Sequence, residues 1–342
     1  MKHFLLAAAI IFLAQSVAAQ NKFAVRQKEA IHFPEWMVCN EAFYNYFSPK
    51  NKIEKIVSGK HFPEGPVWVA ALNGLLFTDI PANKIYFWNQ QKGLSVWLQP
   101  SGFANGLVLD ASGNLMVMQG NHLSTSATKR QVGKIIAPAR NKKITGFITN
   151  YEGKKFNSPN DMAVSPAGSL YFTDPVYGLT NGNADKEKEL FFNGVYQFKN
   201  NKTRLIIDSL QSPNGIGVAP DGKHLYISDS ETGRLLCYAL NDSGDIVSSV
   251  PFFNVPEVWE LLVPSSVRGW DGMAVSRQGV IVASGCGGLW FFSPKGILLG
   301  HIQTPDFTSN VAFDDKEEYI YWTAGKLPFT DGSGAVYRSK IK

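Results

Sequence analysis

The sequence predicts an all-β protein, a six-bladed β-propeller whose ring is closed by a strand from near the N-terminus. One unit recurs along the chain, in which an acidic or amide residue is followed by two short apolar strands. Turns containing Gly and Pro separate these strands, and helical periodicity is scarce after residue 50. About four short strands in each ~40–55-residue unit are typical of propeller blades.

The repeated unit has six copies. They begin, in chain order, at Glu64, Asn105, Asn160, Asn214, Asp271 and Asn310. Within a copy, the two apolar strands read as a hairpin. In residues 165–168 and 219–222, Pro presets the backbone angle and Gly takes the tight position of the turn.

Closure of the ring requires a fourth strand for the last copy, which offers only three. Residues 53–57 precede the first copy and can supply that strand, joining the two ends of the chain. We therefore assign residues 50–342 to the propeller. Residues 20–49 are expected to pack against it as an irregular arm.

The first residues indicate export. A short basic region precedes an apolar run over residues 4–13, and small residues lead to a cleavage site after Ala19. The run is shorter than the ~20 residues that a membrane span needs. We expect residues 1–19 to be a signal peptide and the mature protein to be periplasmic or secreted, without stable membrane insertion. The net charge of +5 is scattered, which argues against nucleic-acid binding.

The residues that begin the repeats predict a metal site. The innermost strand of each blade lines the central pore, so six oxygen-bearing side chains would converge on one axis. Such groups cannot be buried without partners. Carboxylate and amide oxygens suit a hard cation, which makes Ca²⁺ the first choice, with Mg²⁺, Mn²⁺ and Zn²⁺ as alternatives.

Several motifs, in this order and spacing, resemble the gluconolactonase/regucalcin (senescence-marker-protein) family, closest to its bacterial gluconolactonase branch. They are Glu64-Gly65-Pro66, Ser158-Pro159-Asn160-Asp161, Phe172-Thr173-Asp174-Pro175, Ser212-Pro213-Asn214-Gly215 and Asp271-Gly272. The resemblance covers about residues 50–342. It implies a six-bladed propeller with one catalytic divalent cation, held here by Glu64, Asn160, Asn214 and Asp271.

The resemblance also implies a reaction, the hydrolysis of a lactone, and a sugar lactone such as gluconolactone is one candidate. Asp271 would be the general base or the nucleophile, and Asn105, Tyr177 and Trp270 are candidate substrate contacts. Blade packing is an equally good interpretation of Tyr177 and Trp270. An esterase or organophosphate hydrolase on the same scaffold, or a propeller that binds a ligand without catalysis, are the alternatives.

Overall fold

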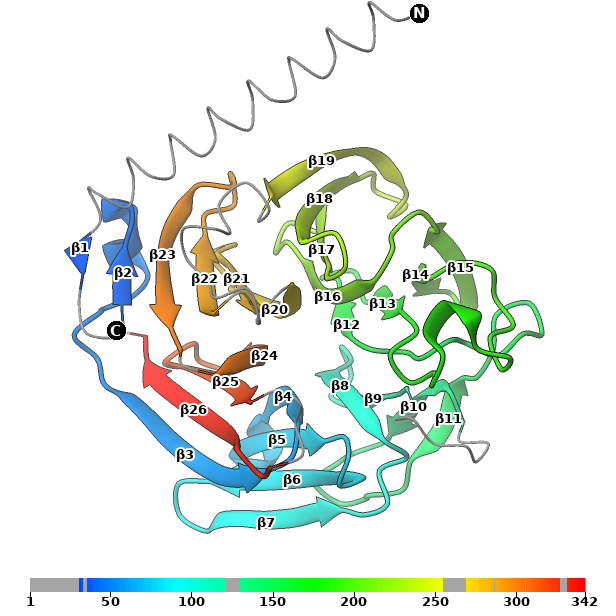
Figure 1. Cartoon of the computed structure of the whole chain (residues 1–342), viewed down its shortest axis with the longest axis horizontal. Helices are drawn as coiled ribbons and strands as arrows, with labels where there is room; N and C mark the ends of the chain where they lie inside the picture. Colours follow the sequence, from blue (N-terminus) through cyan, green and yellow to red (C-terminus); the bar gives the residue numbers. More distant parts are fainter. Residues whose placement is uncertain are drawn as a thin grey trace, which may run out of the picture.

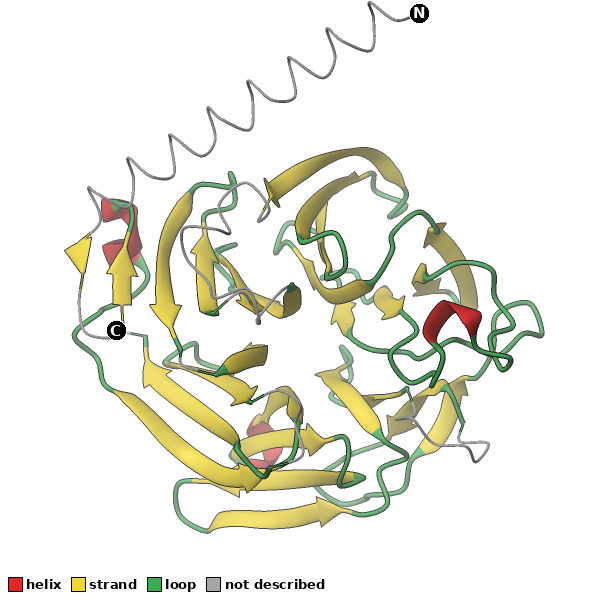
Figure 2. Cartoon of the chain, viewed as in Figure 1, coloured by secondary structure: helices red, strands yellow, loops and turns green. Residues whose placement is uncertain are grey.

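The structure is a computed structural model that describes residues 31–32, 36–120, 129–254, 269–285, 287–304, 306–326 and 331–341. The predicted signal peptide lies outside these residues. The described chain is almost entirely strands and turns, with three short 3₁₀ helices (Figure 2). Six sheets stand around a central axis, which confirms the predicted six-bladed propeller (Figure 1).

Each blade is an antiparallel sheet whose first strand lies innermost. Blade 1 contains β4 (Pro63–Val69), β5 (Gly74–Asp79), β6 (Lys84–Asn89) and β7 (Gly93–Leu98), and blade 2 contains β8 (Ala104–Leu109), β9 (Leu115–Gln119), β10 (Gln131–Ile135) and β11 (Thr145–Ile148). Blade 3 contains β12 (Met162–Val164), β13 (Leu170–Asp174), β14 (Gly194–Lys199) and β15 (Lys202–Ile207), and blade 4 contains β16 (Pro213–Val218), β17 (His224–Asp229), β18 (Arg234–Leu240) and β19 (Ile246–Asn254). Blade 5 contains β20 (Trp270–Val275), β21 (Ile281–Gly285), β22 (Gly288–Phe292) and β23 (Leu298–Gln303), and blade 6 contains β24 (Phe307–Phe313), β25 (Tyr319–Gly325), β26 (Gly334–Lys340) and β3 (Ile53–Lys60). The 3₁₀ helices are η1 (Glu41–Asn45), η2 (Ala70–Leu72) and η3 (Gly182–Ala184).

The sixth blade is built from both ends of the described chain. Its outermost strand is β3, which pairs antiparallel with β26, so that Val57 lies opposite Val336 and Ile53 opposite Ser339. The segment that the sequence offered as the fourth strand, residues 53–57, falls within β3.

The turns inside the blades follow from their sequences. Gly168 and Gly222 adopt φ angles of +78° and +70°, a left-handed conformation that glycine tolerates without steric cost. The N–H of Gly168 donates to the carbonyl oxygen of Ser165, and that of Gly222 to Ala219, at 2.8 Å in each case. These bonds close the tight turns between the first and second strands of blades 3 and 4.

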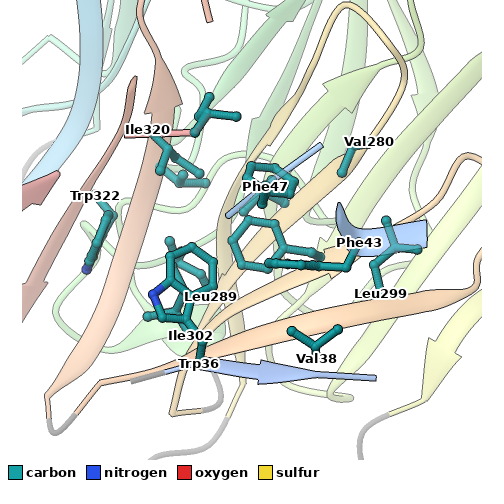
Figure 3. Packing of buried hydrophobic residues seen from close by; sticks show 14 of the residues in the cluster. Trp36, Val38, Phe43, Phe47, Val280, Leu289, Leu299, Ile302, Ile320 and Trp322 are labelled. Carbon is teal, nitrogen blue, oxygen red and sulfur yellow. The ribbon is translucent and has the colours of Figure 1, made fainter. Parts of the chain in front are cut away.

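The segment before β3 extends blade 5 and is more regular than the irregular arm that the sequence suggested. Strand β2 (Trp36–Val38) pairs with β23, and β1 (Ile31–His32) pairs with β2. Trp36 is buried, stacks on Phe291 at a centroid distance of 5.9 Å and meets the edge of Phe43 at 5.6 Å (Figure 3). Apolar burial therefore holds this short strand on the blade.

The cores lie between neighbouring blades. Tyr226 and Leu235 of blade 4, for example, share a cluster with Trp270, Trp290 and other side chains of blade 5. Because each sheet presents apolar side chains to both neighbours, the blades stack into a continuous ring. No helix in the described part of the chain is long and apolar enough to cross a membrane.

Strand direction decides which loops meet at one end of the pore. Neighbouring strands in a blade are antiparallel, so the connection into the first strand and the connection between the second and third strands open on the same face of the ring. We call this side the entry face. In blades 3 and 4 it is formed by residues 175–193, 208–212 and 230–233.

Candidate metal centre and active site

The structure places the predicted ligands around the pore at the entry face. Each of Glu64, Asn214 and Asp271 is the second residue of an innermost strand, and Asn160 lies just before β12. All four are buried, with exposed fractions of 2%, 6%, 7% and 5% for Glu64, Asn214, Asp271 and Asn160. Asn105 occupies the matching position in blade 2 and is more open.

The carboxyl groups of the pore repel one another. Burial raises the pKa of Glu64 to about 8, and the nearby charge of Asp161 adds to the rise. Hydrogen bonds to Glu64 Oε2 from Gly65 N–H (2.7 Å) and Asn310 Nδ2 (3.0 Å) oppose this shift. Burial raises the pKa of Asp271 well above its usual value, and Glu64 and Asp161 raise it further. Burial and mutual repulsion therefore favour the protonated, neutral forms of these carboxyl groups.

Amide groups complete the polar lining. No three His, Cys, Asp or Glu side chains among the described residues lie close enough together to hold a metal ion by themselves. The predicted set contains two carboxylates, Glu64 and Asp271, and two amides, Asn160 and Asn214. The Asn214 side chain hydrogen-bonds to Asp271 and so opposes the rise in its pKa.

Asp161 is a pore residue that the sequence analysis missed. In blades 1, 2, 4 and 5, glycine follows the residue that begins the repeat, whereas blade 3 has Asp161 there. Burial raises the pKa of Asp161 to about 7. A Cβ on Gly106 would lie 2.7 Å from Asp161 Oδ1 and 2.6 Å from the carbonyl oxygen of Asn160. The break in the glycine pattern was the available signal.

Asn310 does not begin the sixth repeat, which corrects the register predicted from the sequence. Its N–H donates to Thr323 Oγ1 at 3.1 Å and its Oδ1 accepts from Val311 N–H at 2.8 Å. Asp161 makes the same two kinds of bond, to Thr173 Oγ1 (3.2 Å) and from Met162 N–H (2.8 Å). Asn310 therefore matches Asp161, and Ser309 is the residue that begins the repeat.

Hydroxyl groups, four on second strands and one on a first strand, fasten the blades that carry them to the first strand of the next blade. In each case a Ser or Thr at the pore donates to a main-chain carbonyl of the next blade. The bonds are Thr78 to Asn105 (3.0 Å), Thr173 to Asn214 (2.7 Å), Ser228 to Asp271 (2.8 Å), Ser284 to Ser309 (2.8 Å) and Ser309 to Pro63 (2.8 Å). Between blades 2 and 3, Gly106 N–H donates to the carbonyl oxygen of Asn160 at 2.8 Å. This ladder fixes the backbone that carries the site.

A second set of side chains holds the loops that lead into the pore strands. These are aspartates at the ends of second strands. Asp174 accepts from the N–H groups of Asn157 (2.8 Å) and Ser158 (2.7 Å), just before Asn160. Asp79 does the same for residues 61–62 before Glu64, and Asp229 for residues 211–212 before Asn214. In the sequence, the Thr-Asp or Ser-Asp pair that ends the second strand of a repeat is the signal for this role.

The candidate substrate contacts differ in placement. Tyr177 Oη accepts hydrogen bonds from Ser212 Oγ (2.9 Å) and Asn214 Nδ2 (3.3 Å), which brings the phenol to the edge of the predicted ligand set. Although 41% of Tyr177 is exposed, burial around its hydroxyl raises the pKa to about 12. Trp270 is 1% exposed, and its ring packs edge-on against Trp290 in the core at 6.1 Å.

A cavity of about 930 Å³ opens on the entry face between blades 3 and 4. Tyr177 and Ser212 belong to its wall, while Glu64, Asn160 and Asp271 do not. The cavity thus lies beside the pore and is joined to it through the hydrogen bonds of Tyr177.

Fold and site together define a six-bladed propeller with carboxylate and amide side chains at one end of its pore. The family model of the SMP-30/gluconolactonase/LRE-like region matches residues 62–325, and the chain belongs to this family. It is 34% identical over 291 residues to the gluconolactonase of Zymomonas mobilis, an alignment that covers 80% of this chain and 78% of that protein.

Two solved structures share the fold. A gluconolactonase from Xanthomonas campestris superposes with a TM-score of 0.75 at 24% identity, covering 92% of this chain and 97% of the other. A calcium-binding regucalcin from Agrobacterium tumefaciens gives 0.62 at 16% identity, covering 86% and 94%. The lactone-hydrolysing relative in sequence supports an enzyme that opens lactones and acts on a small molecule.

Proposed function

We propose that the protein is a divalent-metal-dependent lactonase whose cation, Ca²⁺ in the first instance, is held by Glu64, Asn160, Asn214 and Asp271. One observation carries this proposal: Glu64 and Asp271 are buried together in the pore, and the charge of Glu64 raises the electrostatic cost of ionising Asp271. A bound cation would offset that repulsion. The calcium-binding relative and the gluconolactonase relative support the metal and the reaction respectively.

The donor set fits a hard cation. The candidate ligands offer carboxylate and amide oxygens, and none is His or Cys, which Zn²⁺ prefers. Two carboxylates balance a divalent charge, and the neutral amides leave room for oxygens of water or substrate. When bound, the cation supplies positive charge that polarises a carbonyl oxygen and stabilises the oxyanion.

The protein's own groups have distinct roles in this proposal. Asp271 takes a proton from the attacking water. Because a bound cation lowers the pKa of its carboxyl group, positioning of the water and stabilisation of the oxyanion supply most of the acceleration. Direct attack by Asp271 on the carbonyl carbon is the alternative chemistry. Asn105, which is the more open of the pore amides, and the Tyr177 hydroxyl orient the substrate at the rim.

Chelation combined with a substrate panel tests the proposal. Removal of divalent cations with EDTA should abolish hydrolysis of gluconolactone and δ-valerolactone, and added Ca²⁺ should restore it. Simple esters and organophosphates in the same panel identify the alternative hydrolases. Full lactonase activity in EDTA would refute the metal dependence, and no hydrolysis of any substrate with Ca²⁺, Mg²⁺, Mn²⁺ or Zn²⁺ would favour a binding propeller.

A pair of variants separates cation binding from proton transfer. Asp271→Asn keeps an oxygen and nearly the same shape but removes a negative charge and the proton acceptor. It should therefore weaken cation binding and lower kcat by ~100-fold at saturating metal, the usual scale for a positioned proton acceptor. Asn160→Asp adds charge without touching the proposed base and should bind the cation at least as well. Recovery of full kcat by Asp271→Asn at high Ca²⁺ would make Asp271 a ligand only.

We also propose that the protein is exported, on the basis of its first nineteen residues. N-terminal sequencing of the protein from its native host should find a chain beginning at Gln20. A cytoplasmic product that retains residues 1–19 would contradict this.

A further inference from the structure

The cavity beside the pore is larger than a simple sugar lactone requires. Its volume of about 930 Å³ lies near the upper end of the roughly 300–1,000 Å³ range typical of pockets that enclose drug-sized ligands. Three segments build it: the long connection between β13 and β14, the connection from β15 into β16, and the turn after β17. All three belong to the entry face, where the predicted metal ligands lie.

Tyr177 connects the cavity with the pore. Its side chain lines the cavity, and its hydroxyl is hydrogen-bonded to Asn214 Nδ2 and Ser212 Oγ. A substrate whose reacting carbonyl lies in the pore therefore has open space beside it on the Tyr177 side, in which a ring substituent could extend outward.

Several large apolar side chains lie among the polar ones in the walls of this space. Leu179 and Leu190 are buried beneath it, and Leu210 and Phe192 are partly buried. Phe191, in the same wall, is 94% exposed, which is unusual for so large an apolar side chain. Because exposed aromatic surface is costly to hydrate and readily covered by an apolar ligand, Phe191 offers a contact surface rather than core packing.

The charges of the cavity disfavour an anionic ligand. Its one cation, Lys188, donates from Nζ to the carbonyl oxygens of Leu190 and Phe192, the latter at 3.0 Å, so the ammonium is engaged by the protein. Asp185, Asp208 and Glu231 also line the cavity, and the latter two are exposed. Carboxylates and phosphates would meet these three negative groups, and Lys154, whose Nζ lies 5.1 Å from the centroid of the Phe191 ring, is engaged with that ring.

We propose that this cavity is a substituent-binding subsite and that the preferred substrates are lactones carrying an apolar alkyl or aromatic arm. The inference rests on the proposed lactonase function and extends the same site outward between blades 3 and 4. Burial of several methylene groups of such an arm is sufficient for a preference of at least tenfold in KM.

The test compares δ-valerolactone with δ-decalactone, whose ring carries a pentyl arm. The wild-type KM for δ-decalactone should be about tenfold lower. Phe191→Ser should raise that KM severalfold, and Ala184→Trp, which adds bulk at an exposed position of the cavity wall, should raise it at least tenfold. Neither change should alter kcat/KM for δ-valerolactone. The matched control is Ile136→Ser, which removes a 60% exposed apolar side chain after β10, on the opposite face.

The two hypotheses fail in different ways. Binding of the corresponding lactams, which resist hydrolysis, is measured by calorimetry in parallel. No turnover of either lactone would refute the proposed activity, while a tighter pentyl lactam that loses affinity in Phe191→Ser would still support the subsite. Equal KM values for both lactones, or equal affinities for both lactams, would overturn the subsite, as would an effect of Ile136→Ser equal to that of Phe191→Ser.

Discussion

Replacing Glu64 with Gln should stabilise the protein when no cation is present. Gln mimics the protonated carboxyl, and its amide oxygen can still accept from Gly65 N–H and Asn310 Nδ2. In the fold the pKa of Glu64 is raised from 4.5 to about 8, so the unfolded chain releases a proton that the folded protein keeps. Stability is thus lost as pH rises from 4.5 towards 8, and at pH 7 the loss amounts to about 3 kcal/mol at 1.36 kcal/mol per pH unit.

Urea unfolding of wild type and of Glu64→Gln at pH 5, 7 and 8.5 measures this difference in unfolding free energy. In EDTA at pH 7, Glu64→Gln should be up to about 3 kcal/mol more stable than wild type, with a flatter dependence on pH. With Ca²⁺ at a hundred times its Kd, the unfolding free energy of wild type should rise by about 2.7 kcal/mol and that of the variant by much less. The stability advantage of the variant should therefore shrink or reverse. The control is Glu41→Gln, at an exposed position of η1, which should change neither the stability in EDTA nor the stabilisation by Ca²⁺. A variant no more stable than wild type in EDTA at pH 8.5 would refute the reasoning.

Three further predictions concern the scaffold. Thr173→Val removes the donor to the Asn214 carbonyl and the acceptor for Asp161 N–H, and should lower the unfolding free energy by about 1–3 kcal/mol; an unchanged urea midpoint would show that the hydroxyl ladder contributes nothing there. Trp36→Ala should cost about 3–5 kcal/mol because the ring is buried, whereas an arm that contributes nothing to stability would leave thermal unfolding unchanged. Burial lowers the pKa of His301 to about 3, so the folded protein stays neutral there while the unfolded chain takes up a proton below about pH 6.5. Stability is therefore lost as pH falls from 6.5 towards 3, and His301→Gln should weaken that loss in acid unfolding; an identical acid transition in the variant would contradict it.

The fold could be predicted because its information is local and repeated. Each hairpin carries its own turn signal, such as the Pro166 and Gly168 pair, and six approximate copies specify a closed ring even where single copies are weak. The pore residues followed from the same periodicity in five blades. The prediction for the sixth blade failed because the residue that begins the repeat there is Ser309, which looks like an ordinary strand residue, while the amide of Asn310 stands one position later.

The features that could not be predicted depend on contacts between segments that are far apart in sequence. Strand β2 has only three residues, too few for a period-2 pattern, and its burial is decided by β23 and Phe291. The cavity is formed by an irregular connection, 175–193, whose sequence has no periodicity that would place its side chains. Asp161 belongs to the pore because Gly106 of the neighbouring blade leaves room for it.

The pairing of β3 with β26 makes the ring a structure that a growing chain completes last. The four inner strands of blades 1 to 5 are consecutive and can form in order of synthesis, with β1 and β2 added at the edge of blade 5. Blade 6 instead needs residues made near the start and near the end for its four strands. Contacts of such long sequence separation form slowly, since the chain loses loop entropy before the pairing is gained. Until then β26 and β3 each present an unpaired edge, and the pore is bounded by five complete blades and one incomplete blade. Assembly of the proposed cation site, whose candidate ligands lie in blades 1, 3, 4 and 5, is therefore tied to the meeting of the two ends, because blade 6 closes the ring between blades 5 and 1.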